Sequence, residues 1–163
     1  MRPEKISDVS LSCDTQFHGE DGALRLIIPA NERSVRRGLQ TIKSGMSDLR
    51  LSQDDWSTIE LVVAEVLNNI VEHAYREHGD GLIETHLDYS KGALYCKVID
   101  TGCQMPNGQL PDGAQKDLNC QIADLPEGGF GWFLIHQLTQ DLNYARQENR
   151  NTLSFRLPFN RAI

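Results

Sequence analysis

The chain has 163 residues, the usual size of one domain and too short for two well-developed ones. There are 16 Lys and Arg residues and 23 Asp and Glu residues, which gives a net charge of −7. This charge disfavours DNA, RNA and anionic membranes as partners, because phosphate contacts need clustered cations. No apolar run approaches the ~20 residues that span a bilayer, and the N-terminal stretch lacks the apolar segment of a signal peptide. We therefore expect a cytoplasmic protein with reduced cysteines.

The first part of the chain predicts an arm, a strand and a helix. Residues 1–22 are polar and without a sustained period, so we expect an N-terminal arm ahead of a single domain over residues 23–163. Residues 23–29 form a short apolar run that ends in proline, which is typical of a strand. Asn31 can then cap a helix that runs to about Met46.

The middle of the chain predicts a long helix and a hairpin. Ser52 is a good N-cap, and apolar residues recur at helical spacing from there to about Tyr75. Two β segments follow, over residues 82–89 and 93–99, and a short polar turn with one glycine joins them. We expect these segments to pair as an antiparallel hairpin.

Residues 100–127 carry Gly, Pro, Asn and Gln without a clear period. A loop of this length inside a compact domain is uncommon and is usually a functional lid or a disordered segment. A glycine-rich stretch, 128–131, leads into a helix from Trp132 to about Thr139, and a hairpin over residues 142–158 closes the chain. The order of elements predicts an α/β fold, a two-layer sandwich of a mostly antiparallel sheet with helices on one face.

A first group of polar residues lies on the long helix. Glu65, Asn69 and His73 are spaced four residues apart and share one stripe of that helix. A carboxylate and a carboxamide one turn apart suit a site that needs a base and an oxygen ligand for a hard cation. The solvated stripe of an ordinary amphipathic helix carries the same pattern, so this group alone leaves both interpretations open.

Two further groups lie at element ends. Asp100 ends an apolar strand, where a carboxylate can accept a hydrogen bond from an amino group, and Gly102 would let the backbone approach a planar ring. The glycine-rich stretch 128–131 opens a helix, where free backbone N–H groups and the helix dipole attract an anion such as phosphate. An ordinary Asp-x-Gly turn and a flexible hinge are the alternative interpretations.

The order of these groups is more specific than any one of them. A helix with E-x-x-x-N, a strand that ends D-x-G, a long loop and a G-G-x-G helix start resemble the Bergerat-fold ATPases, which include gyrase B subunits, histidine kinases and MutL. The strings EVLNNIVEHAY and GGFGWFLI resemble the bacterial anti-sigma factor serine kinases of partner-switching systems. The resemblance covers about residues 23–158 and implies the Bergerat ATP-binding fold.

The resemblance implies a role for each residue that matches the family pattern. Glu65 would be the general base that activates a serine hydroxyl, and Asn69 would bind the Mg²⁺ that bridges the phosphates of ATP. Asp100 would accept a hydrogen bond from the adenine amino group, and Gly102 would line the base pocket. His73 also matches the pattern, and we expect it to be structural.

The second glycine box and the last strand complete the implied site. Gly129, Phe130 and Gly131 would offer backbone amides to phosphate, and Thr152 would lie near the adenine. One position departs from the pattern, because Gln104 stands where the first glycine box often has its second glycine. A left-handed backbone at that position would be unfavourable for glutamine.

The implied function is an ATP-dependent anti-sigma regulator. Such a protein phosphorylates a serine on a STAS-type anti-anti-sigma partner and sequesters a sigma factor, and proteins of this kind commonly form homodimers. The alternative is a catalytically weak or inactive nucleotide-gated protein-binding module. Gln104 and the presence of only one lysine in the expected lid, Lys116, favour this alternative.

Overall fold

The computed structural model describes residues 11–18, 21–76, 80–113 and 129–159. The strands are β1 (Ser12–His18), β2 (Asp21–Pro29), β3 (Leu82–Ser90), β4 (Ala93–Asp100), β5 (Gln140–Gln147) and β6 (Arg150–Pro158). The helices are α1 (Glu32–Gly45), α2 (Gln53–Asn69), the π-helical turn η1 (Ile70–Ala74), the 3₁₀ turn η2 (Pro106–Gly108) and α3 (Gly129–Leu138).

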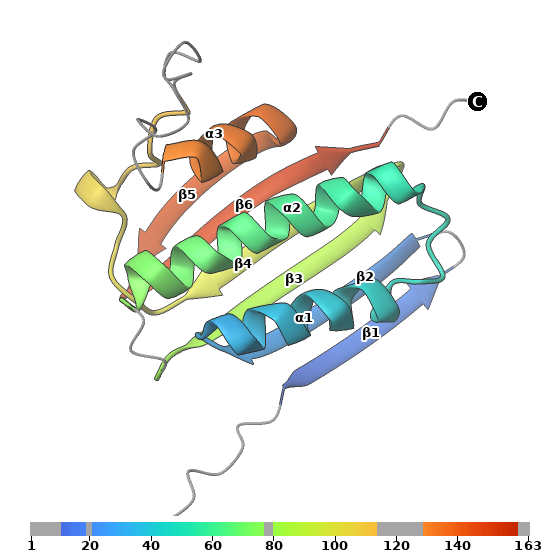
Figure 1. The fold of residues 1–163 in the computed structure, drawn as a ribbon, viewed down its shortest axis with the longest axis horizontal. Helices are drawn as coiled ribbons and strands as arrows, with labels where there is room; N and C mark the ends of the chain where they lie inside the picture. The colour runs from blue at the N-terminus through green and yellow to red at the C-terminus, as the bar shows by residue number, and fades with distance from the viewer. Residues whose placement is uncertain (1–10, 19–20, 77–79, 114–128, 160–163) are drawn as a thin grey trace, which may run out of the picture.

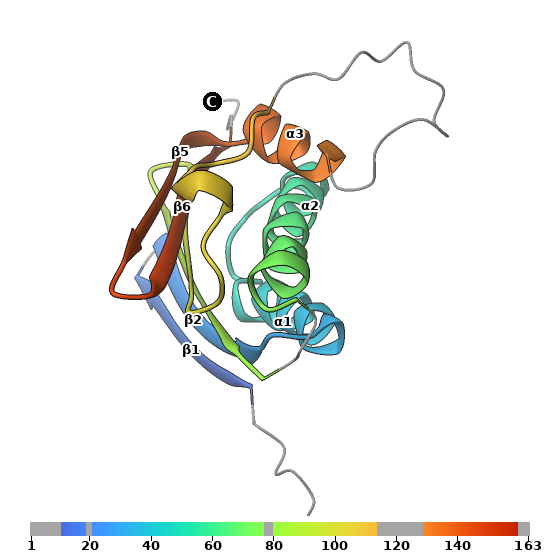
Figure 2. The same cartoon turned by 90° about the vertical axis from the view of Figure 1, so that its left-hand side faces the viewer.

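The described residues form a two-layer sandwich. Six strands make one sheet in the order β1-β2-β3-β4-β6-β5, and every neighbouring pair is antiparallel. Helices α1, α2 and α3 cover one face of this sheet, and α2 lies over its middle (Figures 1 and 2). The predicted fold class, an antiparallel sheet with helices on one face, is confirmed.

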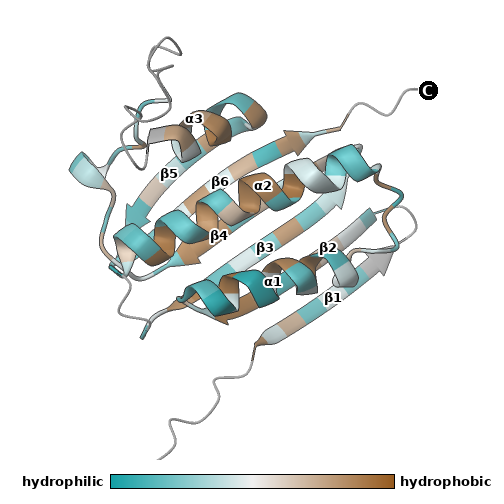
Figure 3. Cartoon of the chain, in the orientation of Figure 1, coloured by the Kyte–Doolittle hydropathy of each residue, from teal (hydrophilic) through white to brown (hydrophobic). Residues whose placement is uncertain are grey.

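The core lies between the helices and the sheet. Its largest fully buried aliphatic side chains come from both layers: Leu26, Ile28, Met46, Ile59, Leu67, Ile83, Leu87, Leu94, Ile135 and Leu157. Hydrophobic and hydrophilic residues alternate along the strands (Figure 3), because successive side chains of a strand point to opposite faces. No helix within the described ranges is long and apolar enough to cross a membrane.

The two helix starts that the sequence predicts from N-cap residues are confirmed. The side chain of Asn31 accepts a hydrogen bond from the backbone N–H of Ser34 at the start of α1. Ser52 and Asp55 form a capping box at the start of α2, in which each side chain accepts from the other residue's backbone N–H, at 3.1 and 2.9 Å. These bonds satisfy N–H groups that a helix leaves unpaired at its first turn.

The expected N-terminal arm is partly wrong. Residues 12–18 form strand β1, which pairs with β2 over its whole length, and β2 begins at Asp21 rather than at residue 23. Leu11, Cys13 and Phe17 alternate with polar residues in this segment, which is the period of a strand, and Leu11 and Cys13 pack against the core. Residues 1–10 lie outside the described part of the chain.

Candidate active site

A pocket of about 520 Å³ opens between the C-terminal end of α2, the end of β4 and the start of β6. It is lined by Val66, Asn69, Ile70, His73, Ala74, Arg76, Asp100, Cys103, Gln104, Met105, Pro106, Pro111, Trp132, Tyr144, Asn151 and Leu153. A second hollow, of about 750 Å³, lies over the strands, and none of the site residues expected from the sequence lines it. The pocket of about 520 Å³, which contains Asn69 and Asp100, is therefore the candidate site.

Asp100, the last residue of β4, is the buried carboxylate of this pocket and is 5% exposed. Its Oδ1 accepts hydrogen bonds from the backbone N–H of Gly102 at 2.9 Å and from Nδ2 of Asn151 at 2.8 Å. Burial raises the pKa of Asp100, and these two hydrogen bonds and the positive charge of Arg146 oppose that rise. Within the described residues, both hydrogen bonds go to Oδ1, which leaves Oδ2 for a ligand.

Gly102 is needed because the loop after β4 passes directly against the end of η1. A Cβ at this position would lie 2.6 Å from the carbonyl oxygen of Ala74, and the N–H of Cys103 donates to that oxygen at 2.8 Å. Gln104 is not among the residues with positive φ, so the strain expected from its place in the glycine box does not arise. The departure from the family pattern therefore leaves the loop unstrained at this point.

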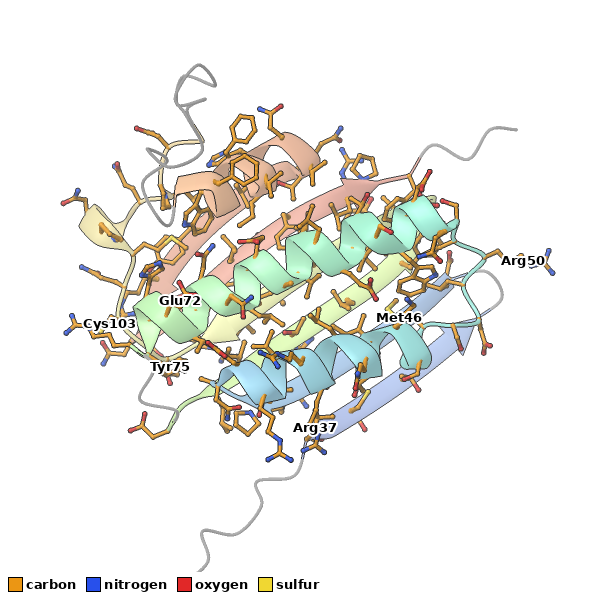
Figure 4. The ribbon with its side chains drawn as sticks, viewed as in Figure 1. Arg37, Met46, Arg50, Glu72, Tyr75 and Cys103 are labelled. Carbon is orange, nitrogen blue, oxygen red and sulfur yellow. The ribbon has the colours of Figure 1, made fainter. Side chains whose placement is uncertain are left out.

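The π turn η1 fixes this end of the pocket. Its last hydrogen bond joins the N–H of Tyr75 to the carbonyl of Ile70 across five residues. The hydroxyl of Tyr75 donates to the carbonyl of Leu82 at 2.8 Å and accepts from the N–H of Thr101 at 2.9 Å. Figure 4 shows Tyr75 and Cys103 at the same end of the molecule. Single π turns inside α-helices are frequent at functional sites.

Glu65 and Asn69 of α2 meet the glycine-rich stretch at the start of α3 where these two helices contact each other. A Cβ on Gly131 would lie 2.5 Å from Oε2 of Glu65 and 3.9 Å from Nδ2 of Asn69, so only glycine allows this approach. The first N–H groups of α3 have no partner within the helix and carry partial positive charge. The helix begins at Gly129 rather than at the expected Trp132, so the glycines form its first turn.

Asn69 lines the pocket and has one unpartnered hydrogen-bond donor. Its Nδ2 is buried and has no hydrogen-bond partner among the described residues, although a buried amide normally has one. No group of three or more His, Cys, Asp or Glu side chains in the described ranges could hold a metal ion. A neutral amide oxygen fits Mg²⁺ as one ligand among several, with the remaining oxygens supplied by phosphate and water.

Phe130 and the expected lid lie at the edge of this site. The Phe130 side chain is 52% exposed and stacks on Phe133 with ring centroids 5.9 Å apart, so it does not line the pocket. The part of the expected lid from Gln104 to Gly113 is described, and the carbonyl of Pro111 accepts a hydrogen bond from Nε2 of His136 at 2.9 Å. The rest, residues 114–128, lies outside the described part of the chain.

Thr152, which the sequence predicts to lie near the adenine, is not among the residues that line the pocket. Asn151 and Leu153, its neighbours on β6, both line the pocket, and successive side chains of a strand point to opposite faces. The hydroxyl of Thr152 therefore points to the other face of the sheet. The alternation of Leu153 and Phe155 with polar residues could have identified Asn151 as the inward-facing residue.

The chain is similar to proteins that contain an ATPase domain. A family model described as "Histidine kinase-like ATPase domain" matches residues 28–157. The serine-protein kinases RsbW of Bacillus mycoides (strain KBAB4) and Bacillus cereus (strain ATCC 10987 / NRS 248) are each 27% identical to it over 131 residues, which cover 80% of this chain and 81% of the relative.

A solved structure supports the fold. The RsbU and RsbW domains of a Mycobacterium tuberculosis protein match with a TM-score of 0.57 and 15% sequence identity, over 85% of this chain and 33% of that chain. This chain therefore spans about one third of that protein, and the likeness concerns the fold alone.

Proposed function

Because the chain belongs to the histidine kinase-like ATPase domain family, we propose that it is an ATP-dependent anti-sigma factor with serine protein kinase activity. It phosphorylates a serine on a STAS-type anti-anti-sigma partner and sequesters a sigma factor, and so regulates transcription without binding DNA itself. The similarity to two RsbW serine-protein kinases supports this function. The observation that carries it is the convergence of Glu65, Asn69 and Gly131 beside the pocket that contains Asp100.

In this proposal the adenine of ATP occupies the Asp100 end of the pocket. The buried carboxylate accepts from the exocyclic amino group of the base, because Oδ2 is not engaged by the described residues. Gly102 lines the base through its backbone, and the absence of a side chain keeps the loop against Ala74. A pocket of about 520 Å³ has the volume expected for a small-molecule ligand.

The phosphates extend toward the start of α3. The backbone N–H groups of Gly129, Phe130 and Gly131 lie in the first turn of this helix, where an anion is stabilised by unpaired donors and by the helix dipole. Asn69 would hold Mg²⁺ through its amide oxygen, and the ion would supply charge neutralisation on the phosphates. This arrangement compensates for the net charge of −7, which would otherwise repel a nucleotide.

Glu65 acts as the general base. Its carboxylate takes the proton from the partner's serine hydroxyl as the serine oxygen bonds to the γ-phosphorus and the bond from that phosphorus to the β–γ bridging oxygen breaks, so that ADP leaves. The position of Glu65 against the first turn of α3 supports its role as the base beside the proposed phosphate site. The serine substrate therefore approaches from the α2–α3 side.

The wider assignments follow from the same family. We assign residues 23–163 to one ATPase domain, and β1 and the first residues of β2 extend its sheet toward the N-terminus. The protein is cytoplasmic and forms a homodimer, and the edge strand β1 offers backbone groups that can pair with another chain. Light scattering that gives the mass of one chain at micromolar concentration would contradict the dimer.

The test is transfer of radiolabel from ATP to a purified STAS-type partner. Glu65→Gln should lower the rate about 10²- to 10⁴-fold, the range for loss of a general base. Glu72→Gln is the matched control, because Glu72 is an exposed carboxylate in η1 that does not line the pocket, and it should transfer at the wild-type rate. Equal transfer by wild type and Glu65→Gln contradicts the assigned base, and nucleotide binding without any transfer supports the inactive binding module.

A further inference from the structure

A side-chain amide beside Asp100 has every hydrogen-bonding position filled. Asn151, at the start of β6, is 4% exposed and lies directly opposite Asp100 in the β4–β6 ladder. Its Oδ1 accepts from the hydroxyl of Tyr144 and from Nη1 of Arg146, both at 2.7 Å. Its Nδ2 donates to Oδ1 of Asp100 at 2.8 Å. Because arginine can only donate and an ionised carboxylate can only accept, the orientation of the amide is determined.

The same side chains hold the loop that follows β4. Nδ2 of Asn151 also donates to the carbonyls of Cys103 at 3.0 Å and Gly102 at 3.3 Å. Arg146 donates to the carbonyl of Gly102 at 3.0 Å, and the hydroxyl of Tyr144 accepts from the N–H of Met105 at 3.1 Å. The loop is therefore held from the β5–β6 hairpin by three side chains.

This arrangement decides which part of Asp100 a ligand can reach. Asn151 and the N–H of Gly102 both occupy Oδ1, so Oδ2 is the oxygen that remains for the ligand within the described residues. A carboxylate oxygen accepts from the amino group of adenine and is repelled by the carbonyl oxygen that guanine has at the same ring position. The selection between the two bases depends on keeping this carboxylate ionised and correctly oriented.

We propose that Asn151 is the positioning residue that makes the nucleotide pocket selective for adenine. It holds the carboxylate of Asp100 with Oδ2 toward the base and fixes the surrounding loop. This inference rests on the proposed ATP site and adds a residue to it that the sequence pattern does not assign. Tyr144 and Arg146 support Asn151 by donating to its amide oxygen, and each also bonds the loop directly.

Two substitutions of Asn151 give opposite dependences on pH. Asn151→Ala removes the donor to Asp100, which allows the carboxylate to take up a proton more easily, so ADP affinity falls as the pH is lowered. Asn151→Asp keeps the shape and the acceptor for Tyr144 and Arg146. When the two facing carboxyls share one proton, the proton replaces the lost N–H donor, so ADP affinity is highest at low pH and falls as the pH rises.

Other charged and titratable groups near Asp100 have to be accounted for. They come from η1, from the second residue after it, from the loop after β4 and from β5: His73, Arg76, Cys103, Tyr144 and Arg146. Each variant is therefore compared with the wild type at every pH. A His73→Gln background removes the imidazole that lines the same pocket and should leave the opposite slopes of the two variants in place.

The experiment is calorimetric titration of the full chain with ADP and GDP from about pH 5.5 to about pH 8.5, a range in which shifted carboxyl groups titrate. At neutral pH, Asn151→Ala should bind ADP about 10- to 100-fold more weakly, the usual effect of losing a hydrogen bond to a charged group. Its preference for ADP over GDP should fall toward unity. Ser154→Ala, on the same strand but outside the pocket, should bind as the wild type does.

Three outcomes are distinguishable. Opposite pH slopes of the two Asn151 variants support the proposal, and thermal unfolding of each variant confirms that it is folded. Wild-type ADP affinity and selectivity in folded Asn151→Ala would overturn the positioning role and leave the ATP site intact. Failure of the wild type to bind ADP at any pH would instead contradict the proposed function. If Asn151→Ala is unfolded, Tyr144→Phe tests the same role, because it removes one donor to the amide and should weaken ADP binding several-fold.

Discussion

We expect substitution of Gly131 by alanine to displace the proposed base, Glu65, without lowering the stability of the fold. The added Cβ would lie 2.5 Å from Oε2 of Glu65, so this oxygen has to retreat by about 1 Å to reach an ordinary contact distance. A displacement of about 1 Å can lower a rate about 10²-fold. Alanine favours a helix over glycine by up to about 1 kcal/mol, and the carboxylate is the end of a flexible side chain, so we expect no loss of stability.

The assay is phosphate transfer at saturating ATP, together with thermal unfolding of the same samples. Gly102→Ala is the comparison, because its Cβ would lie 2.6 Å from the backbone oxygen of Ala74, which cannot rotate away. That variant should lose about 1–3 kcal/mol of stability, as overpacked sites do. A folded Gly131→Ala that transfers phosphate at the wild-type rate would refute the placement of Glu65 as base. Equal destabilisation by both alanines would refute the assumption that the carboxylate can move aside.

Two further predictions concern the base end of the pocket. Burial raises the pKa of Asp100 in the folded chain, so the contribution of Asp100 to stability is present at low pH and is lost as the pH rises through that pKa. At about pH 8, Asp100→Asn should therefore unfold at no lower a temperature than the wild type. The same variant should bind ADP about 10- to 100-fold more weakly. Unfolding of this variant well below the wild-type temperature would contradict the first part. Cys103 is exposed and lines the pocket, so ADP should slow its alkylation several-fold, measured by peptide mass spectrometry, whereas Cys96 is buried with a raised pKa and should not react in either state. Unchanged labelling of Cys103 at saturating ADP would place the nucleotide elsewhere.

The helices and most strands could be predicted because their determinants are local. Asn31 and Ser52 cap the two helices as their residue types predict, and apolar spacing located α2 to within a residue at its start. Strand β1 is short and lies in a polar part of the chain, so the alternation of Leu11, Cys13 and Phe17 with polar residues is a weak local signal, and its pairing with β2 adds the rest. The π turn at the end of α2 was also not predicted, since helical spacing does not distinguish it from an α-helical turn.

The candidate site could be predicted only where a residue type was itself informative. Glu65 and Gly131 are 66 residues apart in sequence by their numbering, and their contact follows from α2 packing on α3. Asn151 was overlooked in favour of Thr152, because the role of a strand residue depends on which face it occupies. The pairing of Asp100 with Asn151 depends on the register between β4 and β6, which no single strand encodes.

The central claim is that one ligand, ATP, joins Asp100 to the Glu65–Gly131 contact. The most direct test is a crystal structure of the full chain with Mg²⁺ and a non-hydrolysable ATP analogue. We predict the adenine amino group at Oδ2 of Asp100 and the phosphates at the first turn of α3, beside Asn69. An analogue bound instead in the hollow over the strands, or a pocket left unfilled at saturating analogue, would contradict the account.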